Sequence, residues 1–199
     1  MVATPSTMLP LGTPAPAFEL PEPLTGKTVR LADFDDAEAL VVAFICNHCP
    51  YVIHLKEALV TFARDLAPEG VSMVAISAND AEAYPQDGPE KMAEEARAYG
   101  YPFPYLYDET QEVAKAYGAA CTPDFYLFGR DRKLVYRGQF DATRPDHRTA
   151  PDTPDRGAEP TGEDLRTAVR LLLDGKEVPA EGQRPSLGCN IKWKPENTG

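Results

Sequence analysis

The sequence predicts an α/β protein whose central mixed β-sheet is flanked by helices on both faces. Two continuous apolar runs, at 40–45 and 71–77, are typical of strands buried on both faces of a sheet. Each run precedes an amphipathic helical pattern, and a later pair of short apolar segments predicts a hairpin. Long right-handed crossovers make the early strands parallel, whereas the hairpin adds antiparallel strands.

The first half of the chain predicts two short strands, a buried strand and a long helix. After an extended, proline-rich arm, the short strands at 18–20 and 28–31 flank a turn at 25–27. The helix follows the buried strand, because apolar side chains recur at helical spacing until Pro68-Glu69-Gly70 ends it. These side chains are Val52, Leu55, Leu59, Phe62 and Leu66.

Two further strand–helix units follow. The strand at 71–77 precedes a helix that Pro89 opens and Gly100 ends, since proline suits the first helical position and glycine the position after the last. A short strand at 103–107 comes next, and then a short helix capped by Thr110.

A hairpin and a final helix complete the predicted domain. The hairpin joins 125–128 to 134–140. Residues 141–162 are rich in Pro, Asp, Arg and Thr without periodicity, so we expect a solvated loop. Thr161 and Asp164 resemble a capping box, which would open the last helix.

Length and charge limit the classes of function. The chain has 199 residues, a length that suits one domain. We expect its core at about 12–175, with an N-terminal arm at 1–11, a loop insertion at 141–162 and a C-terminal tail at 176–199. Its net charge of −11 argues against a nucleic-acid partner. The first twenty residues lack a secretory signal, and no apolar run is long enough to span a membrane. We therefore expect a cytoplasmic protein without a membrane partner.

The segment Cys46-Asn47-His48-Cys49-Pro50 joins the first buried strand to the helix after it. Two cysteines three residues apart at this junction can close a small disulfide, and near a βαβ pattern they are typical of a redox motif. The helix N-terminus favours the thiolate, which is the reactive form, and a protonated His48 would stabilise it further. Two inert buried thiols are the alternative.

Three segments together resemble the thioredoxin superfamily and, more narrowly, its peroxiredoxin-like branch of alkyl hydroperoxide reductases and thiol-specific antioxidants. They are Pro14-Ala15-Pro16-Ala17-Phe18-Glu19-Leu20, the two cysteines after a buried strand, and Thr122-Pro123 before a later strand. The likeness covers about residues 12–175 and implies a thioredoxin-like fold. The segments CNHCP, CTPDFYLF and GCNIKWK resemble an uncharacterised bacterial subgroup of this branch.

The resemblance implies a role for each residue at these positions. Cys46, as the first and more exposed cysteine with the lower pKa, would be the nucleophile, and Cys49 would resolve the mixed disulfide. Pro123 would be held cis beside the disulfide, with a trans turn as the alternative. The Thr122 backbone would pair with an extended substrate.

Two departures from the family patterns bear on the reaction. When Cys49 is aligned with the peroxidatic cysteine of P-x-x-x-T/S-x-x-C, Val42 takes the proline position and Cys46 the threonine position. The arginine position falls at about Cys121-Thr122, so the pair that polarises a peroxide is missing, which predicts slow peroxidase chemistry. Leu40 replaces the buried aspartate of thioredoxin, so another group or water must accept the proton of the buried thiol.

Two further cysteines are candidate auxiliary thiols. Cys121 precedes Thr122-Pro123 and is expected close to the cysteine pair, either as a buried unreactive thiol or as a third redox thiol or metal ligand. Cys189 lies in a tail that Ile191 and Trp193 are expected to dock on the domain. It is either part of that anchor or a partner of an active-site thiol.

Four other polar residues are weaker candidates. We interpret His54 as a solvated or core histidine rather than a ligand, and His147 as a solvated loop residue. Asp141 and Arg144 begin the long loop, where surface charge is favoured over a place at the active-site rim.

The sequence therefore predicts a thiol–disulfide oxidoreductase that uses Cys46 and Cys49, more a reductant than an oxidant, with no metal and no cofactor besides its redox-active disulfide. Its partners would be protein or small-molecule disulfides or thiols and an upstream thiol reductant. One alternative is a weak thiol peroxidase. Another is a metal-binding module, with Cys46, Cys49, His54 and Cys121 as soft ligands.

Overall fold

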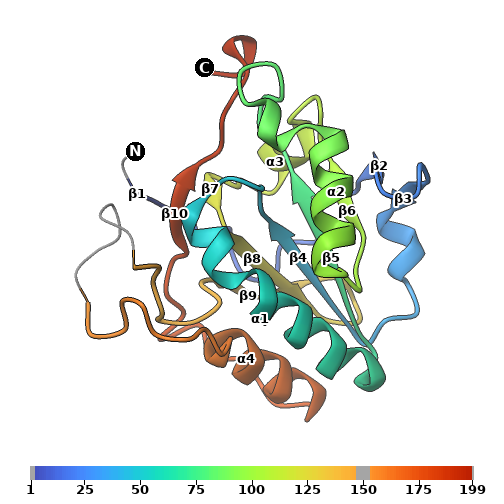
Figure 1. Cartoon of the computed structure of the whole chain (residues 1–199). Helices are drawn as coiled ribbons and strands as arrows, with labels where there is room; N and C mark the ends of the chain where they lie inside the picture. The colour runs from blue at the N-terminus through green and yellow to red at the C-terminus, as the bar shows by residue number, and fades with distance from the viewer. Residues whose placement is uncertain (1–2, 147–152, 199) are drawn as a thin grey trace.

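The computed structural model describes residues 3–146 and 153–198 and has a five-stranded sheet at its centre (Figure 1). The strand order is β6-β5-β4-β8-β9. Strands β4, β5 and β6 are parallel, whereas β8 runs antiparallel to β4 and forms a hairpin with β9. The predicted mixed sheet is confirmed. The bounds are β4 Ala39–Phe44, β5 Val71–Ser77, β6 Tyr105–Tyr107, β8 Asp124–Phe128 and β9 Leu134–Gly138.

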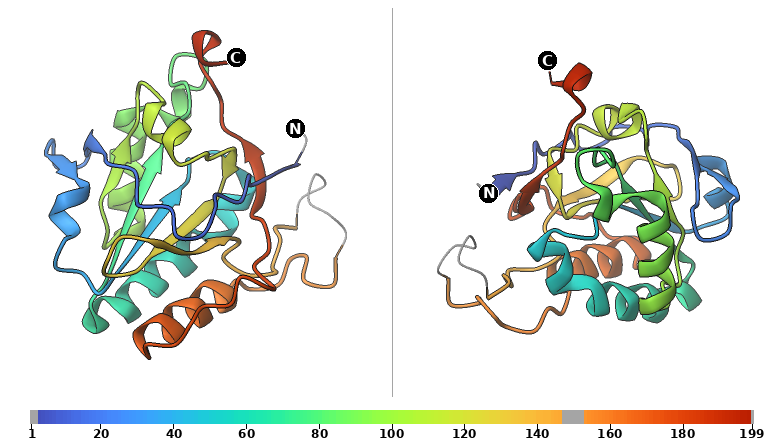
Figure 2. Two further views of the ribbon diagram at one scale, coloured as in Figure 1. Left: turned by 180° about the vertical axis from the view of Figure 1, so that it is seen from behind. Right: turned by 45° about the horizontal axis from the view of Figure 1, so that its top comes forward.

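Helices lie on both faces of this sheet, as predicted (Figures 1 and 2). Helices α1 (Pro50–Leu66), α2 (Pro89–Tyr99) and α4 (Glu163–Leu173) pack their apolar side chains on the face that carries Val41 and Ala43 of β4. The short α3 (Glu112–Ala116) packs on the opposite face. None of the helices in the described part of the chain is long and apolar enough to cross a membrane. Short 3-10 turns occur at Leu31–Phe34, Ala67–Glu69, Pro85–Asp87 and Pro195–Asn197.

The two ends of the chain meet in a second, smaller sheet. Strand β10 (Leu187–Asn190) lies between β1 (Ala3–Pro5) and β7 (Cys121–Thr122) and is antiparallel to both. Figure 2 shows the first and last strands side by side. The tail thus contains a strand that the sequence does not predict, because four residues that include Gly188 carry no hydrophobic alternation. A separate hairpin pairs β2 (Glu19–Pro21) with β3 (Thr28–Arg30).

The predicted capping box at the start of α4 is wrong. The N-cap residue is Gly162, which has no side chain to accept a capping hydrogen bond. The Asp141 carboxylate instead accepts the backbone N–H groups of Thr161 and Gly162, both at 2.7 Å. Asp141 is therefore a buried cap for a distant helix and not a surface charge, since its exposed fraction is 4%.

The short helix α3 begins only partly as predicted. Its N-cap residue is Gln111, in the left-handed region with φ of 65°, but the Thr110 hydroxyl accepts the Glu112 backbone N–H at 3.4 Å, so Thr110 contributes to the cap as predicted. The Asp108 carboxylate accepts the backbone N–H of Ala114 at 2.8 Å and so supplies another part of the cap from outside the expected position.

One buried carboxyl has an unusual environment. Asp124 begins β8, lies opposite Phe44 of β4 and is 1% exposed. The Tyr126 hydroxyl donates to its Oδ2 at 2.8 Å, whereas Oδ1 has no hydrogen-bond partner. Burial raises the pKa of this carboxyl from 3.8 to about 7, and the hydrogen bond from Tyr126 offsets only part of this rise.

Replacing Asp124 with Asn should stabilise the protein in a pH-dependent way. Because the folded state keeps the proton to higher pH than the unfolded chain, stability falls as pH rises from about 4 to about 7. We expect Asp124→Asn to remove this loss, so its gain in unfolding free energy should be about 3 kcal/mol larger at pH 8 than at pH 5. Urea unfolding at both pH values measures this gain, and a pH-independent difference would contradict the assignment.

Candidate active site

The two cysteines of the CNHC segment lie where β4 passes into α1. Cys46 follows the last strand residues, and Cys49 is the N-cap of α1, with extended backbone angles and Pro50 at the first helical position. Proline suits this position because the N–H it lacks would have no partner within the helix. Both side chains are buried, with exposed fractions of 1% for Cys46 and 0% for Cys49.

Thr122 contacts both sulfurs. Its hydroxyl lies 3.4 Å from the Cys46 sulfur, and its carbonyl accepts the Cys49 thiol at 3.1 Å. The Thr122–Pro123 peptide bond is cis. The predictions that Pro123 is cis and that its turn lies beside the cysteine pair are therefore confirmed.

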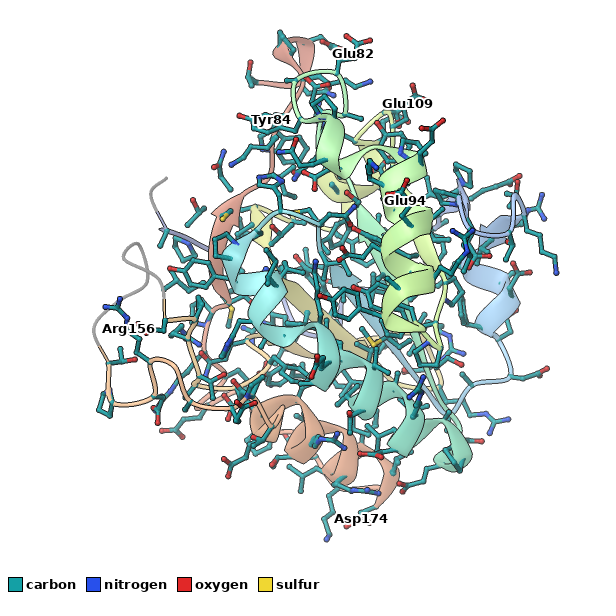
Figure 3. All side chains as sticks on the ribbon, in the orientation of Figure 1. Glu82, Tyr84, Glu94, Glu109, Arg156 and Asp174 are labelled. Atoms are coloured by element: carbon teal, nitrogen blue, oxygen red, sulfur yellow. The ribbon has the colours of Figure 1, made fainter. Side chains whose placement is uncertain are left out.

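His48 points toward a carboxylate that the sequence analysis does not single out. Its Nδ1 lies 2.6 Å from Oδ2 of Asp87, which is completely buried in the segment between β5 and α2. The imidazole also stacks on the Tyr84 ring, with centroids 5.6 Å apart; Figure 3 labels this tyrosine. His48 is thus fixed between a carboxylate and an aromatic ring and is only partly exposed.

Asn47 anchors the turn between the cysteines. Its backbone N–H donates to Oδ1 of Asp87 at 2.9 Å, and its side-chain amide donates to the Gln86 carbonyl at 2.9 Å. The Tyr105 hydroxyl donates to its Oδ1 at 3.0 Å, and the buried Lys56 ammonium donates to its carbonyl at 3.0 Å. These contacts satisfy the polar groups of a nearly buried residue and hold the turn against the surrounding segments.

Asp87 is the main site residue that sequence reasoning misses. It follows Cys49 by 38 positions and lies in a segment without hydrophobic periodicity. Its carboxylate also accepts the His48 backbone N–H and the Asn79 side-chain amide. The only local signal is an acidic residue just before Gly88-Pro89, which is equally typical of an ordinary turn.

The surroundings of the two thiols shift their pKa values in opposite directions. Hydrogen bonding with Cys49, burial and the charge of Asp87 raise the pKa of the Cys46 thiol. Burial also opposes ionisation of Cys49, but hydrogen bonds from the Cys189 and Cys46 thiols and from the backbone N–H groups of Cys189 and Val52 lower its pKa. These directions are opposite to the expectation that Cys46 is the more acidic thiol, whereas Cys46 is the marginally more exposed side chain, at 1% against 0%.

One group of described residues has the composition of a metal site. The Cys46 sulfur, His48 Nδ1 and an Asp87 carboxylate oxygen all lie within 4.8 Å of one another. This group differs from the expected ligand set, since within the described ranges neither His54 nor Cys121 joins such a cluster. The Asp87 oxygens already accept hydrogen bonds from Asn47, Asn79 and His48, so the cluster is satisfied by hydrogen bonds alone.

The other candidate residues lie around this centre at different depths. The Cys121 thiol is buried and contacts the Pro123 carbonyl at 3.7 Å, and burial raises its pKa. His54 Nε2 lies 3.0 Å from the Thr143 hydroxyl, next to a cavity of about 20 Å³ that Pro123 and Arg144 also line. His147 lies outside the described residues.

Two known proteins resemble this chain over most of its length. An uncharacterised conserved protein of Geobacillus kaustophilus is 56% identical, with 98% of each chain covered and a TM-score of 0.88. A peroxiredoxin-like protein of Mycobacterium tuberculosis is 31% identical over 137 residues, which are 69% of this chain and 80% of the relative.

A family model and a more distant structure agree with these relatives. The model of the Redoxin family matches residues 10–153. A thiol:disulfide interchange protein of the thioredoxin family from Chlorobium tepidum is 16% identical, with 81% of this chain and 97% of that chain covered and a TM-score of 0.60. That likeness shows the fold alone, which is thioredoxin-like, as the sequence predicts.

Removal of the Asp87 charge should make the Cys46 thiol more acidic. The carboxylate raises the Cys46 pKa, and Asn at position 87 keeps an oxygen that accepts the turn N–H groups. We expect Asp87→Asn to lower this pKa, stabilise the reduced protein and make its potential at least about 30 mV less negative, which corresponds to about 1.4 kcal/mol. Glutathione equilibration measures the potential. Asp80→Asn, on the same segment, is the control, and an equal shift in both variants would contradict the prediction.

Proposed function

Since this chain belongs to the Redoxin family, we propose that it is a thiol–disulfide oxidoreductase in which Cys46 and Cys49 alternate between dithiol and disulfide. The observation that supports this is the contact of both sulfurs with Thr122, at 3.4 and 3.1 Å, beside the cis Pro123. Two thiols that flank one turn and both contact Thr122 need only a small movement to form a disulfide. Inert core thiols would have no reason to converge on the same backbone turn.

The proposed reaction is reduction of a protein or small-molecule disulfide. Cys46 attacks one substrate sulfur as a thiolate, and the other substrate sulfur leaves as a thiol. Cys49 then attacks the Cys46 sulfur, which forms the internal disulfide and releases the second substrate thiol. An upstream thiol reductant restores the dithiol. Cys46 makes the first attack because it lies beside the partly exposed His48, whereas Thr122 and Cys189 enclose Cys49.

The charges around the pair favour the reducing direction. Strong oxidants of this class stabilise the reduced form through an acidic nucleophilic thiol. Here the positive charge that His48 can carry faces the Asp87 carboxylate at 2.6 Å, so the two side chains together present no net positive charge to Cys46. Burial and the same carboxylate raise the Cys46 pKa. A reducing compartment such as the cytoplasm is where this chemistry would operate.

A thiol peroxidase is the second candidate, because one relative resembles peroxiredoxins and Cys49 accepts helix N-terminal hydrogen bonds. The side chains that would polarise a peroxide are nevertheless missing from their expected positions. Arg144 lines the same cavity as Pro123. Its guanidinium, however, donates to the carbonyls of Asp141 and Thr143 and to Gln139 Oε1. These hydrogen bonds hold Arg144 in its own loop, so its guanidinium is not free to bind a peroxide. Reduction of disulfides is therefore the better-supported function.

The proposal predicts both the potential and the roles of the two cysteines. In glutathione buffers the Cys46–Cys49 couple should have a potential below about −200 mV, in the range of reductants rather than near the −120 mV of strong oxidants. Cys49→Ser should trap a mixed disulfide with substrate, Cys46→Ser should not, and Cys121→Ser should behave as wild type. A potential above about −180 mV would reverse the proposed direction, and trapping by Cys46→Ser alone would assign the attack to Cys49.

Peroxide should react slowly with the reduced protein. The arginine and threonine of the peroxiredoxin pattern are missing from their expected positions, so the polarising pair does not stabilise the charge on the departing oxygen, a contribution worth roughly 10²–10³ in rate for one donor of this kind. We expect a rate constant close to that of an ordinary cysteine thiolate. Stopped-flow fluorescence of Trp193, the single tryptophan, follows the reaction. A rate far above that of a free thiolate would favour the peroxidase.

A further inference from the structure

The tail strand β10 occupies the backbone edge where an extended substrate was expected. Cys189 pairs with Thr122, and Asn190 pairs with Cys121, in antiparallel register. The approach is close at Gly188, where a Cβ atom would lie 1.9 Å from the Thr122 carbonyl oxygen. The expectation that the Thr122 backbone is open to an external substrate is thus corrected, because the chain's own C-terminal strand is already paired there.

This pairing brings a third thiol to the cysteine pair. Cys189 shares one buried cluster with Cys46 and Cys49, although 140 positions separate it from Cys49. The Thr122 carbonyl accepts the Cys49 thiol at 3.1 Å, and Thr122 is the strand partner of Cys189. Strand β10 therefore brings the Cys189 thiol beside the Cys49 sulfur, and this neighbour lowers the pKa of Cys49. Among the described residues these sulfurs do not form a compact group of metal-ligand type, so they are arranged as a chain with Cys49 in the middle.

The remaining cysteine does not belong to this chain of sulfurs. Cys121 precedes Thr122 in β7, and successive side chains of a strand point to opposite faces. Its thiol contacts the Pro123 carbonyl at 3.7 Å. Cys121 is therefore a matched buried thiol that can serve as a control.

We propose that Cys189 is a third redox thiol, which competes with Cys46 as the disulfide partner of Cys49, and that β10 presents it as a built-in substrate strand. This inference rests on the proposed function, because it requires a Cys46–Cys49 disulfide as its starting point. It adds a second oxidised form of the protein and gives the C-terminal tail a role in the reaction.

The exchange step is balanced without an external oxidant or reductant. The Cys189 thiolate attacks the Cys49 sulfur of the Cys46–Cys49 disulfide, the Cys49–Cys189 bond forms and the Cys46–Cys49 bond breaks. Cys46 leaves as a thiolate and takes up the proton that Cys189 released. The protein stays oxidised by two electrons, yet Cys46 is again a free nucleophile beside His48.

Disulfide mapping after oxidation tests this proposal. The protein is equilibrated with oxidised glutathione, free thiols are alkylated under denaturing conditions, and trypsin then separates the cysteines into peptides 31–56, 116–130 and 177–192. In the Cys46→Ser variant, peptide 31–56 should be joined by a disulfide to peptide 177–192, and peptide 116–130 should be alkylated. When Cys121→Ser is combined with Cys46→Ser, this disulfide should remain, whereas combining Cys189→Ser with Cys46→Ser should abolish it. Adding Gly188→Ala, which forces β10 away from Thr122, should also lose the link.

The outcomes separate this inference from the proposed function. Wild-type protein should form a disulfide within 31–56, and its complete failure to do so would reject the Cys46–Cys49 couple itself. If that disulfide forms but Cys46→Ser carries only glutathione on Cys49, the third-thiol proposal is overturned. Should Cys46→Ser not fold, the wild-type protein decides, because the linked 31–56 and 177–192 peptides must appear as a minor species and their absence overturns the proposal.

Discussion

A polar turn must connect the fully buried end of β4 to α1, and the hydrogen bonds that satisfy it hold the surrounding site in place. A buried polar group without a partner costs about 1–3 kcal/mol, so each N–H and carbonyl of this turn needs one. Asp87 accepts the N–H groups of Asn47 and His48, and Lys56 donates to the Asn47 carbonyl. The segment between β5 and α2 therefore has to lie against the cysteines, and it brings a negative charge with it.

Thr122 connects this turn to the two ends of the chain. On one side its hydroxyl and carbonyl contact the two sulfurs, and on the other its backbone pairs with β10, which pairs in turn with β1. The cysteine pair is thus enclosed by groups that are far apart in sequence. A carboxylate beside Cys46 and backbone donors around Cys49 give the two thiols opposite shifts in pKa.

Regular, strongly patterned parts of the chain could be predicted from the sequence. The apolar runs that became β4 and β5, the 3.6-residue spacing of α1 and the turn signals of the β8–β9 hairpin each depend on local chemistry, so the elements appear within a few residues of their expected bounds. The convergence of Cys46, Cys49 and Pro123 was also predictable, because the resemblance of short motifs to a known superfamily carries its spatial arrangement with it.

The site contacts and the thiol pKa values depend on segments that are distant in the chain, so only the tertiary structure determined them. The sequence by itself determined the order of strands and helices and the position of the cysteine pair at a strand–helix junction. It did not reveal that Asp87 faces His48, that Asp141 caps α4, or that β10 places Cys189 against Cys49. The physical reason is that a hydrogen bond or a strand pairing between residues 20 to 140 positions apart leaves no periodic trace in the chain. Such contacts also set the pKa values of both thiols, because burial and neighbouring charges exist only in the folded protein.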